Sequence, residues 1–320
     1  MATLPEFKHI HCSSRYDRSP ESLEADLDDW MDHSSLVTLT EITNDRRAAT
    51  LQEKGWNYYN ARIGPDSDNC GICWRLETWK RTYGVVKRLS TNTFDRFNGM
   101  HNLYIYSCSV VLKHVTSGHK MLVSVSHLPS HIEGDHGLRS VGVGWEGRKR
   151  ATRQALNNWA TQVKDLERKQ HCDGALVIAD WNLNLKDQWV WNLIHDQFTT
   201  YRLAWNQMPT AGGAVTGGPS APQGAPGVST HDRIIDGTLY RGLKLSDGPN
   251  LMARVRSSDH RPYNESFTFL SVGEKEPVDP HDTPSGDVKH PDPWWGFGDT
   301  MTDEIYALES ATGDAGGEVL

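Results

Sequence analysis

The sequence has no long apolar run, and this absence excludes a membrane-spanning helix. Its longest apolar stretches, at residues 122–125 and 175–179, fall far short of the roughly 20 residues that a span needs. Residues 1–18 carry early charges and no apolar core segment, so we expect no secretory signal. These absences predict a cytoplasmic protein without a membrane partner.

The chain also lacks a regular cysteine framework. Its cysteines are five in number and unevenly spaced: Cys12, Cys70, Cys73, Cys108 and Cys172. The Cys70-x-x-Cys73 spacing suits a zinc or redox pair, yet no second Cys or His pair at ligand spacing accompanies it. We therefore favour the interpretation that these are buried thiols in a reducing compartment.

The body of the chain has almost no net charge. Residues 271–320 hold twelve acidic and two basic residues, which leaves 29 acidic and 31 basic residues in 1–270. The formal net charge of −8 therefore arises from an acidic tail on a nearly neutral body. Such a body neither excludes nor by itself predicts a nucleic-acid partner.

Nothing before residue 208 has the composition of a linker, so we predict one domain over residues 1–272. Residues 209–229 are dense in Gly, Pro and Ala, which predicts a flexible surface loop inside that domain. Residues 273–320 are acidic and rich in Pro and Gly. They predict a disordered tail.

The body alternates short β-branched or apolar runs with fewer helical patterns. We expect strands at residues 8–12, 35–40, 71–75, 83–87, 103–111, 120–127, 175–179, 233–239 and 266–270. We expect helices at residues 19–32, 147–169 and 187–196. Many strands with interspersed helices predict an α/β fold of two packed mixed β-sheets flanked by helices.

Polar side chains lie at or near the ends of five expected strands. They are Glu41, His127, the pair Asp180 and Asn182, Asp236, and the pair Asp259 and His260. A single such residue is usually a cap or a loop residue, and the histidines alone would be taken as structural. Five polar strand ends in one chain instead predict an active site, because loops held by a rigid scaffold are where catalytic groups gather.

The ordered set resembles the endonuclease/exonuclease/phosphatase (DNase I-like) superfamily over roughly residues 7–270. The resemblance rests on Glu41, His127-Leu128, Asp180-Trp-Asn182, Ile235-Asp236 and Ser258-Asp-His-Arg-Pro262, in that order. Ala179 stands where the superfamily more often has Gly, and Ser13 stands where its first strand usually ends in Asn. The resemblance implies a four-layer α/β sandwich.

It also implies roles for the matched residues. Glu41 and Asp259 would bind a divalent cation, Mg²⁺ or Mn²⁺. Asp180 would orient the attacking water, and Asn182 would donate to a phosphate oxygen. The His260–Asp236 pair would serve as general base or stabilise the phosphate as imidazolium, and His127 would contact the phosphate or protonate the leaving group.

These roles predict a metal-dependent phosphoesterase, most simply a nuclease acting on DNA, with RNA as the next candidate substrate. A basic stretch at residues 139–169 could hold a nucleic-acid backbone, although such charges also occur on solvated helix faces. A phosphatase or phosphodiesterase for a small molecule or lipid is the first alternative. Ser13 makes an inactive nucleic-acid-binding module the second. No sequence feature fixes an oligomeric state.

Overall fold

The computed structural model describes part of the chain, namely residues 5–14, 20–42, 54–61, 70–90, 105–129, 142–185, 188–207, 234–252, 258, 260–271 and 274. All its helices and strands belong to a first compact unit, Met1–Pro284. The second unit, Ser285–Leu320, lies outside the described residues. So do Asp259, the predicted loop at 209–229, and all of the predicted tail except Glu274.

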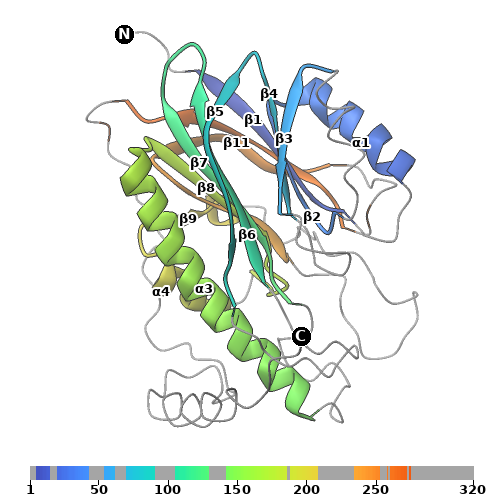
Figure 1. Cartoon of the computed structure of the whole chain (residues 1–320), viewed down its shortest axis with the longest axis vertical. Coiled ribbons are helices and arrows are strands. Elements are labelled where there is room, and N and C mark those ends of the chain that lie inside the picture. Colours follow the sequence, from blue (N-terminus) through green and yellow to red (C-terminus); the bar gives the residue numbers. More distant parts are fainter. Residues whose placement is uncertain are drawn as a thin grey trace, which may run out of the picture. The chain divides into compact units, whose positions relative to one another are not determined.

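Twelve described strands form two six-stranded sheets (Figure 1). The first sheet has the order β11-β12-β1-β2-β4-β3 and contains β1 (Glu6–Ser13), β2 (Leu36–Thr40), β3 (Trp56–Asn60), β4 (Gly71–Arg75), β11 (Leu243–Leu251) and β12 (Tyr263–Phe269). The second has the order β5-β6-β7-β8-β10-β9 and contains β5 (Trp79–Arg88), β6 (Tyr106–His114), β7 (Lys120–His127), β8 (Gly174–Asp180), β9 (Arg202–Leu203) and β10 (Asp236–Arg241). Each sheet is mixed, since β1 and β2 are parallel in one and β7 and β8 in the other.

The two sheets pack on each other through one apolar core. Alternate residues of the strands point into it, as the two-residue period of a strand requires. Phe7 on β1 contacts Phe267 on β12 and the edge of Trp79 on β5. Apolar side chains of β6, β7 and β8 complete this core.

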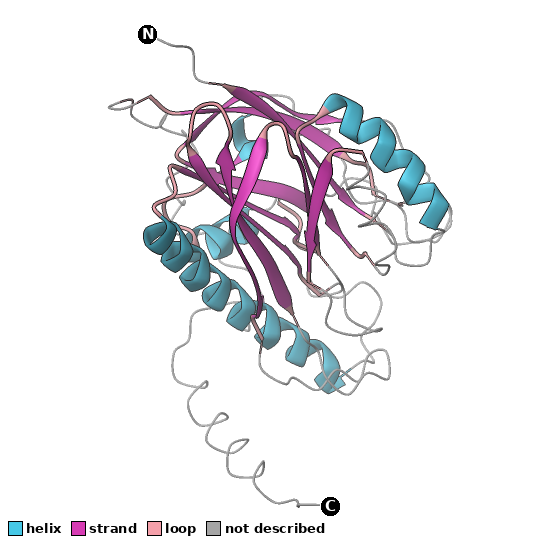
Figure 2. Cartoon of the chain, turned by 45° about the horizontal axis from the view of Figure 1, so that its top comes forward, coloured by secondary structure: helices cyan, strands magenta, loops and turns pink. Residues whose placement is uncertain are grey.

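Helices cover the two outer faces, as Figure 2 shows, and make the fold a four-layer sandwich. They are α1 (Pro20–His33), α3 (Gly142–Gln170) and α4 (Gln188–Gln197), and a short 3₁₀ helix spans Ala204–Gln207. Helix α1 packs Leu23, Leu27 and Trp30 against the first sheet. Helix α3 packs the second sheet through Trp159, whose indole Nε1 donates to Ser124 Oγ on β7 at 2.7 Å. The predicted fold class is confirmed.

Three strands were not predicted, and several predicted elements start three to five residues away from their observed starts. β3, β9 and β11 carry Asn, Asp, Gly or Pro, or are very short, so they lack an apolar strand pattern. The strand expected from residue 233 begins at Asp236. The carbonyls of Ile234 and Ile235 instead accept from Leu185 N and Trp181 N, in the segment after β8. No helix among the described residues is long and apolar enough to cross a membrane.

Candidate active site

Strand register brings the predicted residues to one end of the two sheets. Within the second sheet Asp180, the last residue of β8, is paired with His127 of β7 on one side and Asp236 of β10 on the other. In the first sheet the parallel strands β1 and β2 end together, since Ser13 pairs with Thr40. A hydrogen bond of 3.1 Å from Ser13 Oγ to Asp180 Oδ2 links the ends of the two sheets.

Two site residues have left-handed backbone conformations. Glu41 follows β2 with φ of 57°, and Asn182 follows β8 with φ of 50°. Asparagine adopts this region more readily than most residues. The backbone N–H of Asn182 donates to Asp180 Oδ1 at 3.0 Å. Glutamate rarely adopts the left-handed region, so the backbone at Glu41 is strained. Such strain is typical of functional sites.

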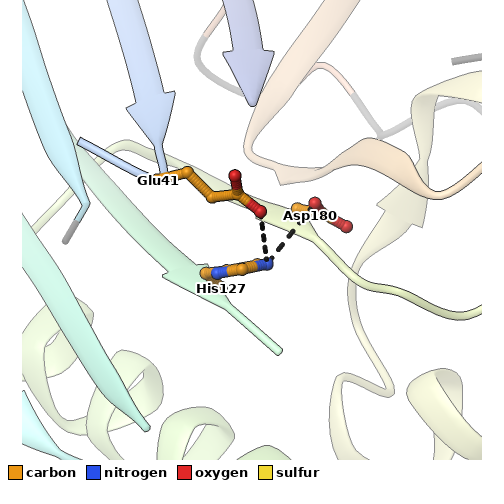
Figure 3. A group of neighbouring side chains, drawn as sticks. All are labelled: Glu41, His127 and Asp180. Atoms are coloured by element: carbon orange, nitrogen blue, oxygen red, sulfur yellow. Dashed lines mark ion pairs between the residues drawn. The ribbon is translucent and has the colours of Figure 1, made fainter. Parts of the chain in front are cut away.

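Glu41, His127 and Asp180 point toward one another (Figure 3). His127 Nε2 lies 3.5 Å from Glu41 Oε1 and 3.5 Å from Asp180 Oδ2. Asp180 is buried, whereas the Glu41 side chain is 21% exposed. The group is therefore open to solvent on the Glu41 side.

Asn182 fixes the orientation of His127. Its amide Nδ2 donates to Leu128 O at 2.7 Å and lies 3.0 Å from His127 Nε2. These contacts hold Asn182 against the His127 ring at the same nitrogen that faces Glu41 and Asp180. In this arrangement Asn182 acts on His127, and the predicted bond to a phosphate oxygen stays a prediction.

His260 and Asp236 form the predicted pair. His260 Nδ1 lies 2.7 Å from Asp236 Oδ2, and Asp236 is buried. Ser258 holds the segment before β12 in place, since its hydroxyl donates to Ser13 O and accepts from His260 N at 2.8 Å. His260 is thereby fixed through both its backbone and its ring.

The two buried carboxylates of the site have opposite electrostatic surroundings. Burial, and then the nearby charge of Asp236, raise the pKa of Asp180. Burial alone would also raise the pKa of Asp236, but the adjacent His260 and His11 outweigh it and hold that pKa below its ordinary value. Asp236 is thus the permanent anion and Asp180 the carboxylate that takes up a proton more readily. Such a separation is typical of acid–base chemistry.

No protein-family model matches the sequence, and no curated protein does either. Solved structures match the fold. The human Nocturnin catalytic domain with bound sulfate anion gives a TM-score of 0.60 at 14% identity, covering 84% of this chain and 97% of that one. A mannosyl-6-phosphatase from Bacteroides thetaiotaomicron gives 0.56 at 14% identity, covering 82% and 100%. D. rerio TDP2 complexed with single-strand DNA product gives 0.55 at 14% identity, covering 82% and 99%.

Other matching structures are described as endonuclease/exonuclease/phosphatase proteins. The chain has the endonuclease/exonuclease/phosphatase fold. The likeness in structure confirms the fold that the ordered motifs predicted.

A divalent metal, which the endonuclease/exonuclease/phosphatase fold implies, fits one side-chain group of the site. One oxygen or nitrogen atom from each of Glu41, His127 and Asp180 lies within 4.8 Å of the others. Hard carboxylate oxygens beside a solvent-open edge suit Mg²⁺ or Mn²⁺, which keep several water ligands. Asp180, Asp236 and His260 form a second such group. In that group His260 Nδ1 is hydrogen-bonded to Asp236. We therefore interpret His260 and Asp236 as a hydrogen-bonded His–Asp pair and not as metal ligands.

Sequence reasoning missed one residue of the site. His11 on β1 is buried, and its Nε2 lies 3.7 Å from Asp236 Oδ1, opposite the oxygen that His260 contacts. No motif contains His11. A polar residue at an inward-facing position of an apolar strand was the one signal that could have identified it.

Part of the basic stretch lies away from the site. Arg168 and Lys169, in the last turn of α3, pair with Asp165 at 3.0 and 2.9 Å. Lys120, the first residue of β7, donates to the final carbonyl of α3 at 3.1 Å. The site lies at the other end of β7, at His127, about 23 Å along the strand. Arg139 and the side chains of Arg148, Lys149 and Arg150 lie outside the described residues.

Proposed function

We propose that this chain is a metal-dependent phosphoesterase and, within that class, a nuclease that hydrolyses phosphodiester bonds of DNA. One observation carries the proposal: three carboxylates, two imidazoles and an amide from both sheets meet at one end of the sandwich. Phosphoester hydrolysis needs an activated water, neutralised phosphate oxygens and an assisted leaving group. This set of side chains can provide each of them.

Asp180 orients and deprotonates the attacking water. The raised pKa of Asp180 is closer to neutral pH, which makes the carboxylate a stronger base. His260 donates Nδ1–H to the anion Asp236, which stabilises the imidazolium, and its Nε2–H would then donate to a phosphate oxygen. His127, oriented by Asn182, contacts the phosphate or the leaving oxygen.

Glu41, with Asp259 as its predicted companion, would hold Mg²⁺ or Mn²⁺ at the solvent-open edge. The bound cation would neutralise charge that develops on the phosphate oxygens. Ser13 does not remove this possibility, since its hydroxyl donates to Asp180 where the superfamily more often has asparagine. The active enzyme therefore stays our proposal, and the inactive binding module is the alternative that an activity assay tests.

A phosphatase acting on a small phosphorylated molecule is the second candidate. The same fold occurs in a mannosyl-6-phosphatase and in TDP2 with single-strand DNA product. Substrate choice in one fold depends on the loops around the site. The nuclease is our first choice because two features together favour a polyanion: the body of the chain is nearly neutral, and the basic stretch at residues 139–169 could hold a nucleic-acid backbone.

A substrate panel tests the proposal. The full chain would be incubated with supercoiled plasmid, single-stranded DNA, RNA, and the phosphate monoesters p-nitrophenyl phosphate and mannose 6-phosphate, with Mg²⁺, Mn²⁺ or EDTA. We expect metal-dependent DNA cleavage with a kcat/KM far above that for the monoesters. Faster release of inorganic phosphate from a monoester would favour the phosphatase. DNA binding without turnover of any ester would overturn the proposal that the chain is an enzyme.

A further inference from the structure

A chain of buried polar side chains runs through the space between the sheets toward the site. It consists of His9 and His11 on β1, Thr38 on β2 and Glu265 on β12, and all four are fully buried. Each shares the strand face that elsewhere packs the apolar core between the sheets, which is where Phe7 and Phe267 lie. Four buried polar groups on such a face need mutual hydrogen bonds to be tolerated.

Short contacts join these groups in sequence. Glu265 Oε2 lies 3.1 Å from His9 Nδ1, and His9 Nε2 lies 2.8 Å from Thr38 Oγ1. The same hydroxyl lies 2.9 Å from His11 Nδ1. Thr38 therefore bridges two imidazoles, and it has a single proton to donate.

The chain reaches the site at Asp236. His11 Nε2 lies 3.7 Å from Asp236 Oδ1, an ion-pair rather than a hydrogen-bond distance, while Asp236 Oδ2 is bonded to His260. A neutral imidazole has one N–H and one lone pair. If the lone pair of His11 faced Asp236 it would repel the carboxylate, so the N–H belongs on Nε2.

This choice at His11 sets the direction of every other bond. With its proton on Nε2, His11 accepts at Nδ1 from the Thr38 hydroxyl, and Thr38 then accepts from His9 Nε2–H. His9 is left with a lone pair on Nδ1, which must face a donor. Glu265 provides one if its carboxyl group is protonated. Donors and acceptors then match at every step.

The pKa shifts of Glu265 and His9 agree with this assignment of donors and acceptors. Burial raises the pKa of Glu265 to about 8, so its carboxyl group keeps its proton at neutral pH. Burial, and then the neighbouring His11, lower the pKa of His9 well below its ordinary value, so His9 is neutral. Neither Glu265 nor His9 thus carries a charge at neutral pH, as a site between two apolar sheets requires.

We propose that His11 is a positioning residue, which Thr38 holds as the neutral Nε2–H tautomer so that it orients the Asp236 carboxylate. The consequence for catalysis rests on the proposed function, since Asp236 matters there through its bond to His260. Oriented from one side by His11 and from the other by His260, the Asp236 carboxylate is held in the orientation that accepts the His260 hydrogen bond.

The tautomer is measured directly by ¹⁵N NMR on the full chain labelled with ¹⁵N-histidine. His11→Gln assigns the signals of His11 among the 15 histidines. We expect a protonated Nε2 and an unprotonated Nδ1 for His11 in the wild type. An Nδ1–H tautomer or an imidazolium at neutral pH would overturn the proposal. This readout requires no activity, so it stands apart from the proposed function.

Two variants of Thr38 test the link to catalysis. Thr38→Val keeps the shape of the side chain and removes the hydroxyl, and Thr38→Ser keeps the hydroxyl and serves as the control. We expect Thr38→Val to lower kcat on the best phosphoester about tenfold with KM changed less than twofold, and Thr38→Ser to restore kcat. Equal kcat in folded Thr38→Val and wild type would overturn the positioning role. If the wild type turns over no ester, the proposed function fails while the tautomer result is unaffected.

Discussion

Asp180 and Asp236 are adjacent partners in the second sheet, and each is 1% exposed. Their surroundings differ in distance and charge. Asp236 lies 2.7 Å from His260 Nδ1, whereas Asp180 lies farther from its imidazoles, 3.5 Å from His127 Nε2 and 3.8 Å from His260 Nδ1, and has the charge of Asp236 beside it. A close imidazole donor stabilises a carboxylate and a neighbouring anion destabilises it, so Asp236 stays ionised and Asp180 is the better proton acceptor. Two aspartates that are paired across neighbouring strands thereby have different roles.

Buried Glu265 gives a residue-scale prediction about pH and stability. Its pKa of about 8 in the folded chain lies above the unfolded value of about 4.3. The protonated carboxyl group therefore stabilises the fold at low pH, and this contribution is lost as pH rises through the folded pKa. Relative to Glu265→Gln, the wild type should lose up to about 4 kcal/mol of unfolding free energy between pH 5 and pH 8.

Urea denaturation of both proteins at several pH values measures this difference. Glutamine keeps the shape of the side chain and a donor for His9, so the hydrogen-bonded chain persists in the variant. Glu24→Gln, on the exposed side of α1, is the matched control and should show no such pH trend. A stability difference that stays constant from pH 5 to pH 8 would contradict a neutral buried Glu265.

At the scale of elements, the turn between β10 and β11 leaves no room for a side chain. Gly242 has φ of 67°, and an added Cβ would lie 2.2 Å from Asp173 O. Gly55 has a similar φ of 78° with nothing within 4 Å of such a Cβ. The two glycines thus share a positive φ, but only at Gly242 would an added Cβ clash with a neighbouring atom.

We expect Gly55→Ala to cost about 1 kcal/mol of unfolding free energy, because alanine disfavours this φ. Gly242→Ala should cost about 1–3 kcal/mol more, because the turn or the backbone before β8 must also move. Chemical denaturation of both variants gives the comparison. Equal losses would show that the clash at Gly242 is relieved without cost.

Sequence patterns located the elements that end in motifs, and did so for a physical reason. The strands that lead to Glu41, His127 and Asp180 are short apolar runs, each followed by a polar group. β11 was missed because its Gly and Pro resemble a turn, although it pairs along β12. His11 was missed because its meaning comes from Asp236, far along the chain, and single-sequence periodicity carries no information on such contacts.

At the scale of the whole molecule, the site belongs to neither sheet alone. Ser13 and Glu41 come from strands of the first sheet, whereas His127, Asp180 and Asp236 come from the second. The hydrogen bond between Ser13 and Asp180 crosses from one sheet to the other. The packing of the core between the sheets therefore sets the distances in the site. The central claim, phosphoester hydrolysis, depends on this packing being native.

Initial rates of plasmid cleavage with Mg²⁺, with Mn²⁺ and with EDTA, in wild type and His260→Gln, test that claim most directly. His33→Gln, the same substitution at an exposed position of α1, is the matched control. We predict that EDTA abolishes cleavage, that His260→Gln lowers kcat/KM about 10²- to 10⁴-fold, and that His33→Gln keeps the wild-type rate. Cleavage that persists in EDTA, or that is equal in wild type and His260→Gln, would contradict the account.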